Sequence, residues 1–330
     1  MAGLNPPPDG TTVRRAALRI APDDHGTPVL AFLVRRFTYH AESEWAGLLA
    51  RSRLLVNGLP VIVANYALQT GDRLEYLPEE VAEPPVDTSW RILLEDDAGF
   101  LAVDKPGNLP CHPGGRYFHH TLWYQLRERR AATHLSLVNR LDRETSGLVL
   151  AALNSKTASA IQGQFARRTV RKSYLAVVEG VFPAAVPEAH GWMLTDTGCE
   201  VRKKRRFQPA EPGSVPPEPD AEWAETGFRA VRTAAGLSMV EVLPHTGRLH
   251  QIRATLQALG FPVVGDKLYG LDPLLFLRFR DGMLSNADHR RLRLPRQALH
   301  AWKLSLRHPA TGLPLELEAP PPPDLLALVP

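Results

Sequence analysis

Cysteine is scarce in this chain of 330 residues, which contains only Cys111 and Cys199. Two isolated thiols cannot build the disulfide framework of a small secreted scaffold, and they favour a reducing compartment. No apolar run reaches the roughly 18 residues that a membrane-spanning helix needs. The N-terminal stretch MAGLNPPPDGTTVRR lacks the apolar core of a secretory signal. From these features we expect a cytoplasmic protein without a membrane partner.

Lysine is also scarce, since arginine supplies all but 7 of the 39 basic side chains. Residues 1–89 hold 8 basic and 11 acidic side chains, whereas the rest of the chain holds 31 and 24. The planar arginine side chain suits phosphate recognition better than the point charge of lysine, but high arginine content can equally reflect genome base composition. A positive surface for nucleic acid is therefore expected in the C-terminal part.

The chain is predicted to contain a tail, a small domain, a linker and a large domain. Proline and glycine dominate residues 1–12, which we expect to be disordered. Residues 13–78 combine apolar residues at helical spacing with the hairpin signal Asn57-Gly58, which predicts a small α/β domain. Residues 79–89 are rich in proline and acidic residues and predict a stiff linker.

The large domain, residues 90–325, mixes the patterns of strands and helices. Strands are predicted at residues 92–95, 100–104, 148–153 and 173–178, and helices at 122–130, 156–167 and 250–259. The strands outnumber the helices and do not alternate with them, which argues against a doubly wound parallel sheet. We predict an α+β fold around a mostly antiparallel mixed sheet, with residues 208–222 as an irregular loop between strands.

A polar run from Asn139 to Gly147 leads directly into the apolar strand that begins at Leu148. This order places Asp142 on a loop held by a rigid element, where functional carboxylates are common. On residue types alone, a surface turn in which Asp142 pairs with a neighbouring arginine, Arg140 or Arg143, is the more frequent outcome.

Two further stretches place polar or aromatic residues beside apolar elements. Tyr174 interrupts an aliphatic strand that follows the basic residues 167–172. The stretch TGRLHQIR opens a helix, whose free N–H groups favour an anion. The polar side chains in the first turns of this helix are Arg248, His250, Gln251 and Arg253. Read alone, the Tyr174 stretch favours a half-buried structural tyrosine beside a solvated basic edge. The alternative for the TGRLHQIR stretch is helix capping with ordinary surface charge.

Taken together, these stretches resemble the RluA-like family of RNA pseudouridine synthases. RLDRETSG, RKSYLAVVEG, TGRLHQIR and VVGDKLYG follow the order of that family, with KPGNLPCHPGG before them and ALHAWKLSLRHPATG after them. The resemblance spans residues 90–325 and implies the pseudouridine synthase fold with a central RNA-binding cleft. Residues 13–78 resemble the alpha-L RNA-binding module of a ribosomal small-subunit protein. Here, however, Glu42 and Glu44 stand where that module usually carries basic residues.

The resemblance also implies roles for individual residues. Asp142 matches the catalytic aspartate, and Arg253 matches the basic residue that pairs with it. Tyr174 matches the tyrosine that stacks on the target base and is proposed to take the proton from C5. Arg140 would fill the gap left by the flipped nucleotide, and Ile252 would line the pocket. The other residues expected to bind substrate are Arg143, Arg248, His250 and Gln251.

The implied reaction converts N1-linked uracil into C5-linked uracil. No redox step occurs and no leaving group needs a metal, so we expect neither a cofactor nor a metal. A single ionised carboxylate can act as a nucleophile at C1′ or as a base at C2′, and the sequence leaves both routes open. The expected partner is ribosomal or transfer RNA, bound by a monomer.

Two other functions stay open on the sequence alone. A non-catalytic RNA-binding protein could use the same scaffold, but it would tend to lose one of Asp142, Tyr174 and Arg253. A glycosidase or another hydrolase usually needs two carboxylates, and Glu144 is the candidate nearest to Asp142 in the sequence. The chain departs from the family pattern at residues 139 and 255, which are Asn and Thr where histidine is usual.

Overall fold

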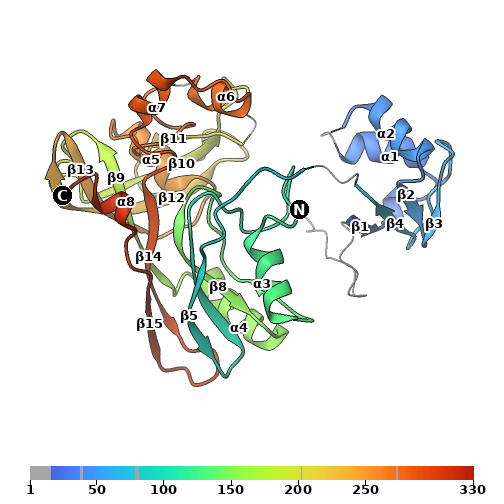
Figure 1. Ribbon diagram of the computed structural model, residues 1–330, viewed down its shortest axis with the longest axis horizontal. Coiled ribbons are helices and arrows are strands. Elements are labelled where there is room, and N and C mark those ends of the chain that lie inside the picture. Colours follow the sequence, from blue (N-terminus) through green and yellow to red (C-terminus); the bar gives the residue numbers. More distant parts are fainter. Residues whose placement is uncertain (1–15, 38–39, 79–81, 202, 273) are drawn as a thin grey trace. The chain divides into compact units, whose positions relative to one another are not determined.

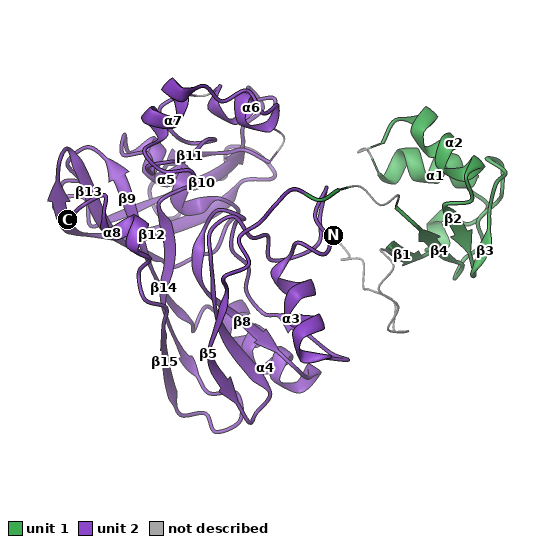
Figure 2. Cartoon of the chain, in the orientation of Figure 1, with its two compact units in different colours: residues 1–83 green, residues 84–330 purple. Residues whose placement is uncertain are grey.

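The chain forms two compact units, residues 1–83 and residues 84–330, which are coloured separately in Figure 2. The computed structural model describes residues 16–37, 40–78, 82–201, 203–272 and 274–330. The predicted disordered tail, residues 1–12, lies outside these ranges. The boundary between the two units falls inside the segment 79–89 that the sequence indicates as a linker.

The smaller unit packs two helices against a four-stranded antiparallel sheet with the strand order β1-β4-β2-β3. Its elements are β1 (Ala16–Arg19), the 3-10 helix η1 (Pro22–Asp24), α1 (Val29–Arg36), α2 (Glu42–Ala50), β2 (Leu54–Val56), β3 (Leu59–Pro60) and β4 (Arg73–Tyr76). Asn57 and Gly58 connect β2 to β3 with φ values of 52° and 84°. Two positive φ angles define the turn that Asn-Gly favours, so the predicted hairpin is confirmed.

The larger unit is built on a sheet of 11 described strands. Nine of these strands follow the order β11-β10-β12-β13-β9-β14-β8-β6-β5, while β15 pairs with β14 and β7 pairs with β8. The strands are β5 (Arg91–Asp96), β6 (Phe100–Lys105), β7 (Ser136–Leu137), β8 (Ser146–Ala152), β9 (Arg171–Glu179), β10 (Glu188–Thr195), β11 (Arg205–Pro209), β12 (Glu222–Ala234), β13 (Leu237–Pro244), β14 (Leu299–Arg307) and β15 (Pro314–Glu318). Among these described strands, β14 and β8 form the parallel pair and the other pairings are antiparallel.

Helices cover both faces of this sheet. They are α3 (Leu122–Arg130), α4 (Ser155–Ala166), α5 (Gln251–Ala258), α6 (Leu275–Arg280), α7 (Asn286–Leu292) and α8 (Pro323–Leu326). Leu122 of α3 and Ile161 of α4 belong to different apolar cores, one on each side of β6 and β8. Figure 1 shows α6 and α7 together at the end of the unit away from α4. The predicted α+β fold around a mostly antiparallel mixed sheet is confirmed.

Strands β6 and β8 are buried on both faces, which explains their nearly continuous apolar sequences. Along β6, Phe100 and Ala102 face one core, while Leu101 and Val103 face the other. This alternation follows from the two-residue repeat of a strand. The two strands therefore form a rigid base for the polar segment that precedes β8.

The strand β14 brings two candidate site segments together. Ala301 of β14 pairs with Gly147 of β8 on one side and with Tyr174 of β9 on the other. Gly147 has a φ of 107°, and a Cβ atom there would lie 2.2 Å from the carbonyl oxygen of Ala301. Because only glycine permits this backbone angle and this close approach, Gly147 fixes the end of the Asp142 segment beside Tyr174.

The expectation of an irregular loop over residues 208–222 is wrong at its two ends. Gln208 and Pro209 belong to β11, where Gln208 pairs with Trp192 of β10. Glu222 begins β12 and pairs with Met193. Both ends are drawn into the sheet because β10 offers backbone partners on each of its edges, which the local sequence does not show. None of the described helices has the length and apolar character needed to cross a membrane.

Candidate active site

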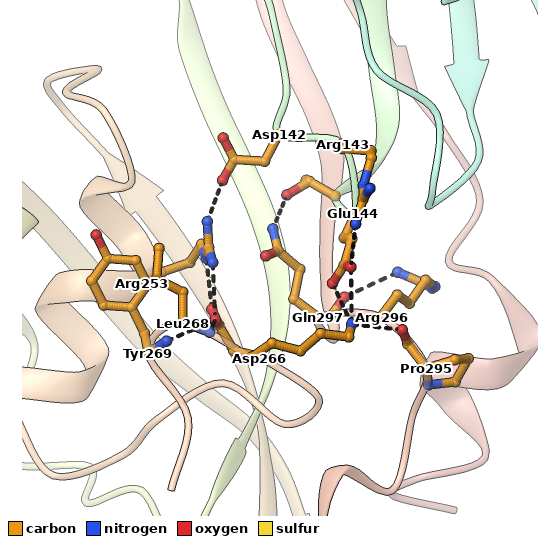
Figure 3. Close-up of polar contacts among 12 residues, drawn as sticks. Asp142, Arg143, Glu144, Arg253, Asp266, Leu268, Tyr269, Pro295, Arg296 and Gln297 are labelled. Atoms are coloured by element: carbon orange, nitrogen blue, oxygen red, sulfur yellow. Dashed lines mark hydrogen bonds and ion pairs between the residues drawn. The ribbon is translucent and has the colours of Figure 1, made fainter. Parts of the chain in front are cut away.

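Asp142 lies on the segment between β7 and β8 and is bonded to a side chain of helix α5. Arg253 Nη1 donates a hydrogen bond of 2.9 Å to Asp142 Oδ2, as Figure 3 shows. The Asp142 side chain is 31% exposed, whereas that of Arg253 is 9% exposed. In the described structure neither Arg140 nor Arg143 pairs with Asp142. The carboxylate is therefore held from the interior and keeps a face open to solvent.

The backbone around Asp142 is anchored by buried polar side chains. Lys105 is 0% exposed, and its ammonium group donates to three carbonyl oxygens, those of Pro106, Leu109 and Arg143. These bonds use all three ammonium protons, and burial lowers the pKa of Lys105 to about 8. Asn139 bonds to the backbone of β8 through both ends of its amide. The position of Asp142 is therefore set by the fold.

Arg253 is itself held by a second carboxylate, that of Asp266. Arg253 Nε donates to Asp266 Oδ2 at 2.6 Å, and Nη2 donates to Oδ1 at 2.9 Å. Asp266 also accepts bonds of 2.9 Å from the backbone N–H groups of Leu268 and Tyr269. Its side chain is 0% exposed. The guanidinium group thus bridges a buried carboxylate and the partly exposed one (Figure 3).

His250 faces the second oxygen of Asp142. Its Nε2 lies 3.9 Å from Asp142 Oδ1, and its Nδ1 lies 3.0 Å from Tyr269 Oη. The same Tyr269 oxygen accepts the backbone N–H of Arg205 at 2.8 Å. Tyr269 Oη can then donate its proton in the hydrogen bond to His250 Nδ1, and in the neutral tautomer that accepts this bond the imidazole proton lies on Nε2. In this tautomer His250 directs an N–H group towards Asp142.

The electrostatic environment keeps Asp142 ionised. Burial alone would raise the pKa of Asp142, but the charge of Arg253, the neighbouring His250 and the hydrogen bond from Arg253 bring that pKa below its ordinary value. Burial and the charge of Arg253 lower the pKa of His250 to about 4. At neutral pH the site therefore contains a carboxylate anion beside a guanidinium cation and a neutral imidazole.

Tyr174 is half-buried where two apolar cores meet. Burial and the charge of Asp142 raise the pKa of Tyr174 to about 12. Its hydroxyl group is therefore a neutral phenol at physiological pH, close enough to Asp142 to respond to its charge. Ile252 lies in the same core as Tyr174 and is 8% exposed.

The other residues predicted to bind substrate differ in whether their side chains already bond within the protein. Arg140 is exposed and has no hydrogen-bond or ion-pair partner among the described residues. Arg143 donates to Tyr117 Oη at 2.7 Å and to Glu144. Arg248 bonds to the carbonyl of Trp223 and to Glu222. Gln251 is 3% exposed, and both ends of its amide bond within the protein. This arrangement favours a structural role for Gln251.

No role for Asp266, Lys267 or Tyr269 is predicted from the sequence. All three lie in the stretch VVGDKLYG, which contributed to the resemblance but whose side chains were not assigned. Lys267 is 4% exposed and donates to both carboxylate oxygens of Glu144, at 2.9 and 2.8 Å. Successive residues of this stretch thus reach Arg253 and the Asp142 segment. Among the described residues, no three His, Cys, Asp or Glu side chains are grouped as a metal site requires.

Comparisons with known proteins indicate the family of this chain. A family model described as RNA pseudouridylate synthase matches residues 99–258. The ribosomal large subunit pseudouridine synthase D of Pseudomonas aeruginosa is 30% identical, over 89% of this chain and 88% of that protein. Synthase D of Nitrosomonas europaea is 34% identical, over 72% of this chain and 64% of that protein. The chain also spans 47% of an uncharacterized Caenorhabditis elegans protein that is 34% identical to it.

The comparison with solved structures indicates the same family. The solved structure of human RNA pseudouridylate synthase domain containing 4 superposes with a TM-score of 0.56 at 25% identity, covering 71% of this chain and 90% of that one. The family inferred from the motifs is confirmed: this chain belongs to the RNA pseudouridine synthases.

Proposed function

We propose that this chain isomerises uridine to pseudouridine in structured RNA, with Asp142 as the catalytic carboxylate. The charge and the contacts of the Asp142 carboxylate support this proposal. One of its oxygens is bonded to the buried Arg253, and the other faces His250 at 3.9 Å. An ionised, oriented carboxylate with an exposed face is what either chemical route requires.

Two routes are compatible with this carboxylate. In the first, an Asp142 oxygen attacks C1′ of the ribose, the C1′–N1 bond breaks, and uracil leaves with the electron pair. After the base turns, C5 attacks C1′ and releases the carboxylate. In the second, Asp142 removes the C2′ proton as the C1′–N1 bond breaks, and it returns that proton when C5 bonds to C1′. In both routes C5 then loses its proton and N1 gains one.

Tyr174 is proposed to contact the uracil ring and to relay the C5 proton. A target base outside its stack needs an apolar surface that offsets the few kcal/mol of unstacking, and the half-buried Tyr174 ring provides one. A phenol with a pKa of about 12 is not ionised at neutral pH. Its oxygen can accept the C5 proton while its own proton passes to the Asp142 carboxylate. Charge is balanced because Asp142 ends neutral and then releases the proton to N1 or water.

The surroundings of Glu144 argue against a hydrolase. A glycosidase needs a second carboxylate free to act on water or the leaving group. The Glu144 carboxylate is 13% exposed, and both of its oxygens are bonded to Lys267. Asp142 is thus the better placed of the two carboxylates. A non-catalytic RNA-binding role would not require the arrangement of Arg253 and His250 around Asp142.

RNA contacts are proposed for Arg140, whose exposed guanidinium group is suited to the gap left by a flipped nucleotide, and for Ile252 as a residue in contact with the target base. Arg143, Arg248 and His250 are proposed to contact RNA around that base. The names of the Pseudomonas and Nitrosomonas relatives favour ribosomal RNA as the substrate, with transfer RNA as the second candidate. We propose that the protein acts in the cytoplasm as a monomer without a cofactor.

The smaller unit is proposed to be an alpha-L module of low RNA affinity, because residues 1–89 carry more acidic than basic side chains.

The test is a map of pseudouridine in ribosomal and transfer RNA from cells with and without this gene. We expect at least one pseudouridine to disappear on deletion and to return when the gene is restored. Identical maps from both strains would contradict the proposed activity.

RNA binding by the full chain and by residues 84–330 can be compared at several salt concentrations. Loss of most of the affinity in the shorter chain would contradict the minor role of the smaller unit.

A further inference from the structure

The Arg253 guanidinium group makes more bonds to Asp266 than to Asp142. Two of its hydrogen bonds, from Nε and Nη2, go to Asp266, and one, from Nη1, goes to Asp142. A carboxylate that binds one edge of the planar guanidinium group fixes the plane of that group. Once Asp266 occupies the Nε–Nη2 edge, Nη1 is the nitrogen directed at Asp142 (Figure 3).

The Asp266 carboxylate is held in a fixed position by its surroundings. Its side chain is 0% exposed, and it also accepts backbone N–H groups from Leu268 and Tyr269. The backbone on both sides is constrained by glycine. A Cβ atom on Gly265 would lie 2.0 Å from the Arg296 carbonyl oxygen, and one on Gly270 would lie 2.1 Å from that of Asp266. The loop around Asp266 therefore has little freedom to move.

Tyr269 strengthens the same arrangement. Its ring lies under the Arg253 guanidinium group, with 4.8 Å between the guanidinium carbon and the ring centroid. Its hydroxyl oxygen lies 3.0 Å from His250 Nδ1. The backbone N–H that binds Asp266 and the ring that supports Arg253 thus belong to one residue. Both groups that face Asp142 are oriented from this loop.

We propose that Asp266 is a positioning residue of the isomerisation, which acts through Arg253 by fixing the guanidinium edge that holds Asp142. This inference rests on the proposed function, because it assigns a task to Asp266 only if Asp142 does the chemistry. Asp266 does not touch the substrate. A misplaced Arg253 leaves Asp142 free to rotate away from C1′ or C2′, and misplacement of a reacting group by about 1 Å costs roughly 100-fold in rate.

The experiment compares Asp266→Asn, Arg253→Met, the double variant and wild type on the RNA identified by the pseudouridine map. The Asn side chain keeps the shape of Asp, but its amide nitrogen can no longer accept from Arg253. We expect Asp266→Asn to lower kcat by about 10- to 100-fold and to change KM by less than about threefold. In the Arg253→Met background the same substitution should lower kcat by less than about threefold further, because its effect passes through Arg253.

Asp288→Asn is the matched control. Asp288 also accepts two bonds from one guanidinium group, that of Arg278, and a backbone N–H from Ser285. It is 9% exposed and lies at the start of α7, outside the candidate site. We expect Asp288→Asn to lower the melting temperature but to leave kcat within about twofold of wild type. This control separates a general loss of stability from the effect on Arg253.

Several results would overturn the proposal. A folded Asp266→Asn protein with wild-type kcat would do so, and so would an equal further loss of kcat in the Arg253→Met background. If Asp266→Asn does not fold, Asp266→Glu decides, because it keeps the charge and moves the carboxylate by one methylene group. We then expect a lower kcat at unchanged KM, and a wild-type kcat would overturn the proposal. Failure of the proposed function would look different, since wild type itself would then form no pseudouridine.

Discussion

Replacing Arg253 with methionine should change both the stability of the protein and the pH dependence of its activity. Methionine has a similar length but no charge, so Asp142 and Asp266 lose their shared partner. The buried Asp266 carboxylate and the partly exposed Asp142 carboxylate then lose this cation, and each also experiences the negative charge of the other. The variant therefore removes both the charge of Arg253 and its hydrogen bonds to the two carboxylates.

The size of the effect follows from burial and bonding. Removing one partner of a buried ion pair costs about 3–5 kcal/mol of unfolding free energy, and Asp266 is 0% exposed, so we expect a loss in that range. A hydrogen bond to a charged group contributes about 1.5–3 kcal/mol. Loss of the bond to Asp142 should therefore lower kcat/KM at pH 7 by roughly 10- to 150-fold.

The direction of the pH shift follows from the sign of the pKa change. In wild type the pKa of Asp142 lies below its ordinary value because of Arg253, so the carboxylate is ionised and kcat/KM stays level down to at least about pH 5. Without the guanidinium group, burial and the charge of Asp266 raise the pKa of Asp142. Activity must then fall at a higher pH when the solution is acidified. In wild type His250 adds no change between pH 5 and 8, because burial and the charge of Arg253 hold its pKa at about 4. In Arg253→Met the loss of that charge raises the pKa of His250 as well.

The assay measures tritium released from RNA that carries 5-tritiated uridine, between pH 5 and 9, for wild type, Arg253→Met and Arg253→Lys. Arg253→Lys keeps the positive charge but lacks the planar group that bonds to both Asp142 and Asp266. The decline of its kcat/KM at low pH should therefore stay close to that of wild type, while its kcat falls. Urea unfolding gives the stability of each variant. A folded Arg253→Met protein whose kcat/KM has the pH dependence of wild type would refute the electrostatic role of Arg253.

Two further predictions concern Tyr174 and Lys267. Tyr174→Phe keeps the ring but removes the hydroxyl group, so we expect kcat to fall by about 100-fold or more with little change in KM. Single-turnover tritium release would measure this loss, and an unchanged rate would exclude the proton relay. Lys267→Met leaves the Glu144 carboxylate without its buried partner and should reduce the urea-unfolding free energy by about 3–5 kcal/mol. A loss below about 1 kcal/mol would show that Lys267 does not anchor the Asp142 segment.

Much of the fold was predictable because strong local patterns decide it. The apolar stretch after Gly147 predicts strand β8, and the alternation from Phe100 predicts β6, because each side chain has a core to enter. The Asn57-Gly58 turn follows from backbone angles that few other residues adopt. The ends of β11 and β12 were missed because they depend on pairing with β10, which leaves little trace in a single segment.

The candidate site was predictable only through the resemblance. Nothing local in the sequence indicates that Asp142 pairs with Arg253, because the two residues are brought together by the sheet and by the start of α5. Asp266 was missed for the same reason, since a buried aspartate in a loop looks like an ordinary turn residue in the sequence. Substrate binding by Gln251 stays a prediction from its place at a helix start, and that place does not show that its amide bonds within the protein.

The proposed function depends on the ionised carboxylate of Asp142, which we propose performs the isomerisation. The most direct measurement is pseudouridine formation by purified Asp142→Asn, which keeps the shape and removes the charge, on the RNA that wild type modifies. We expect no detectable pseudouridine from the folded variant, even after long incubation with stoichiometric protein, while RNA binding is retained. Formation of pseudouridine by this variant at a rate near that of wild type would contradict the proposed role of Asp142.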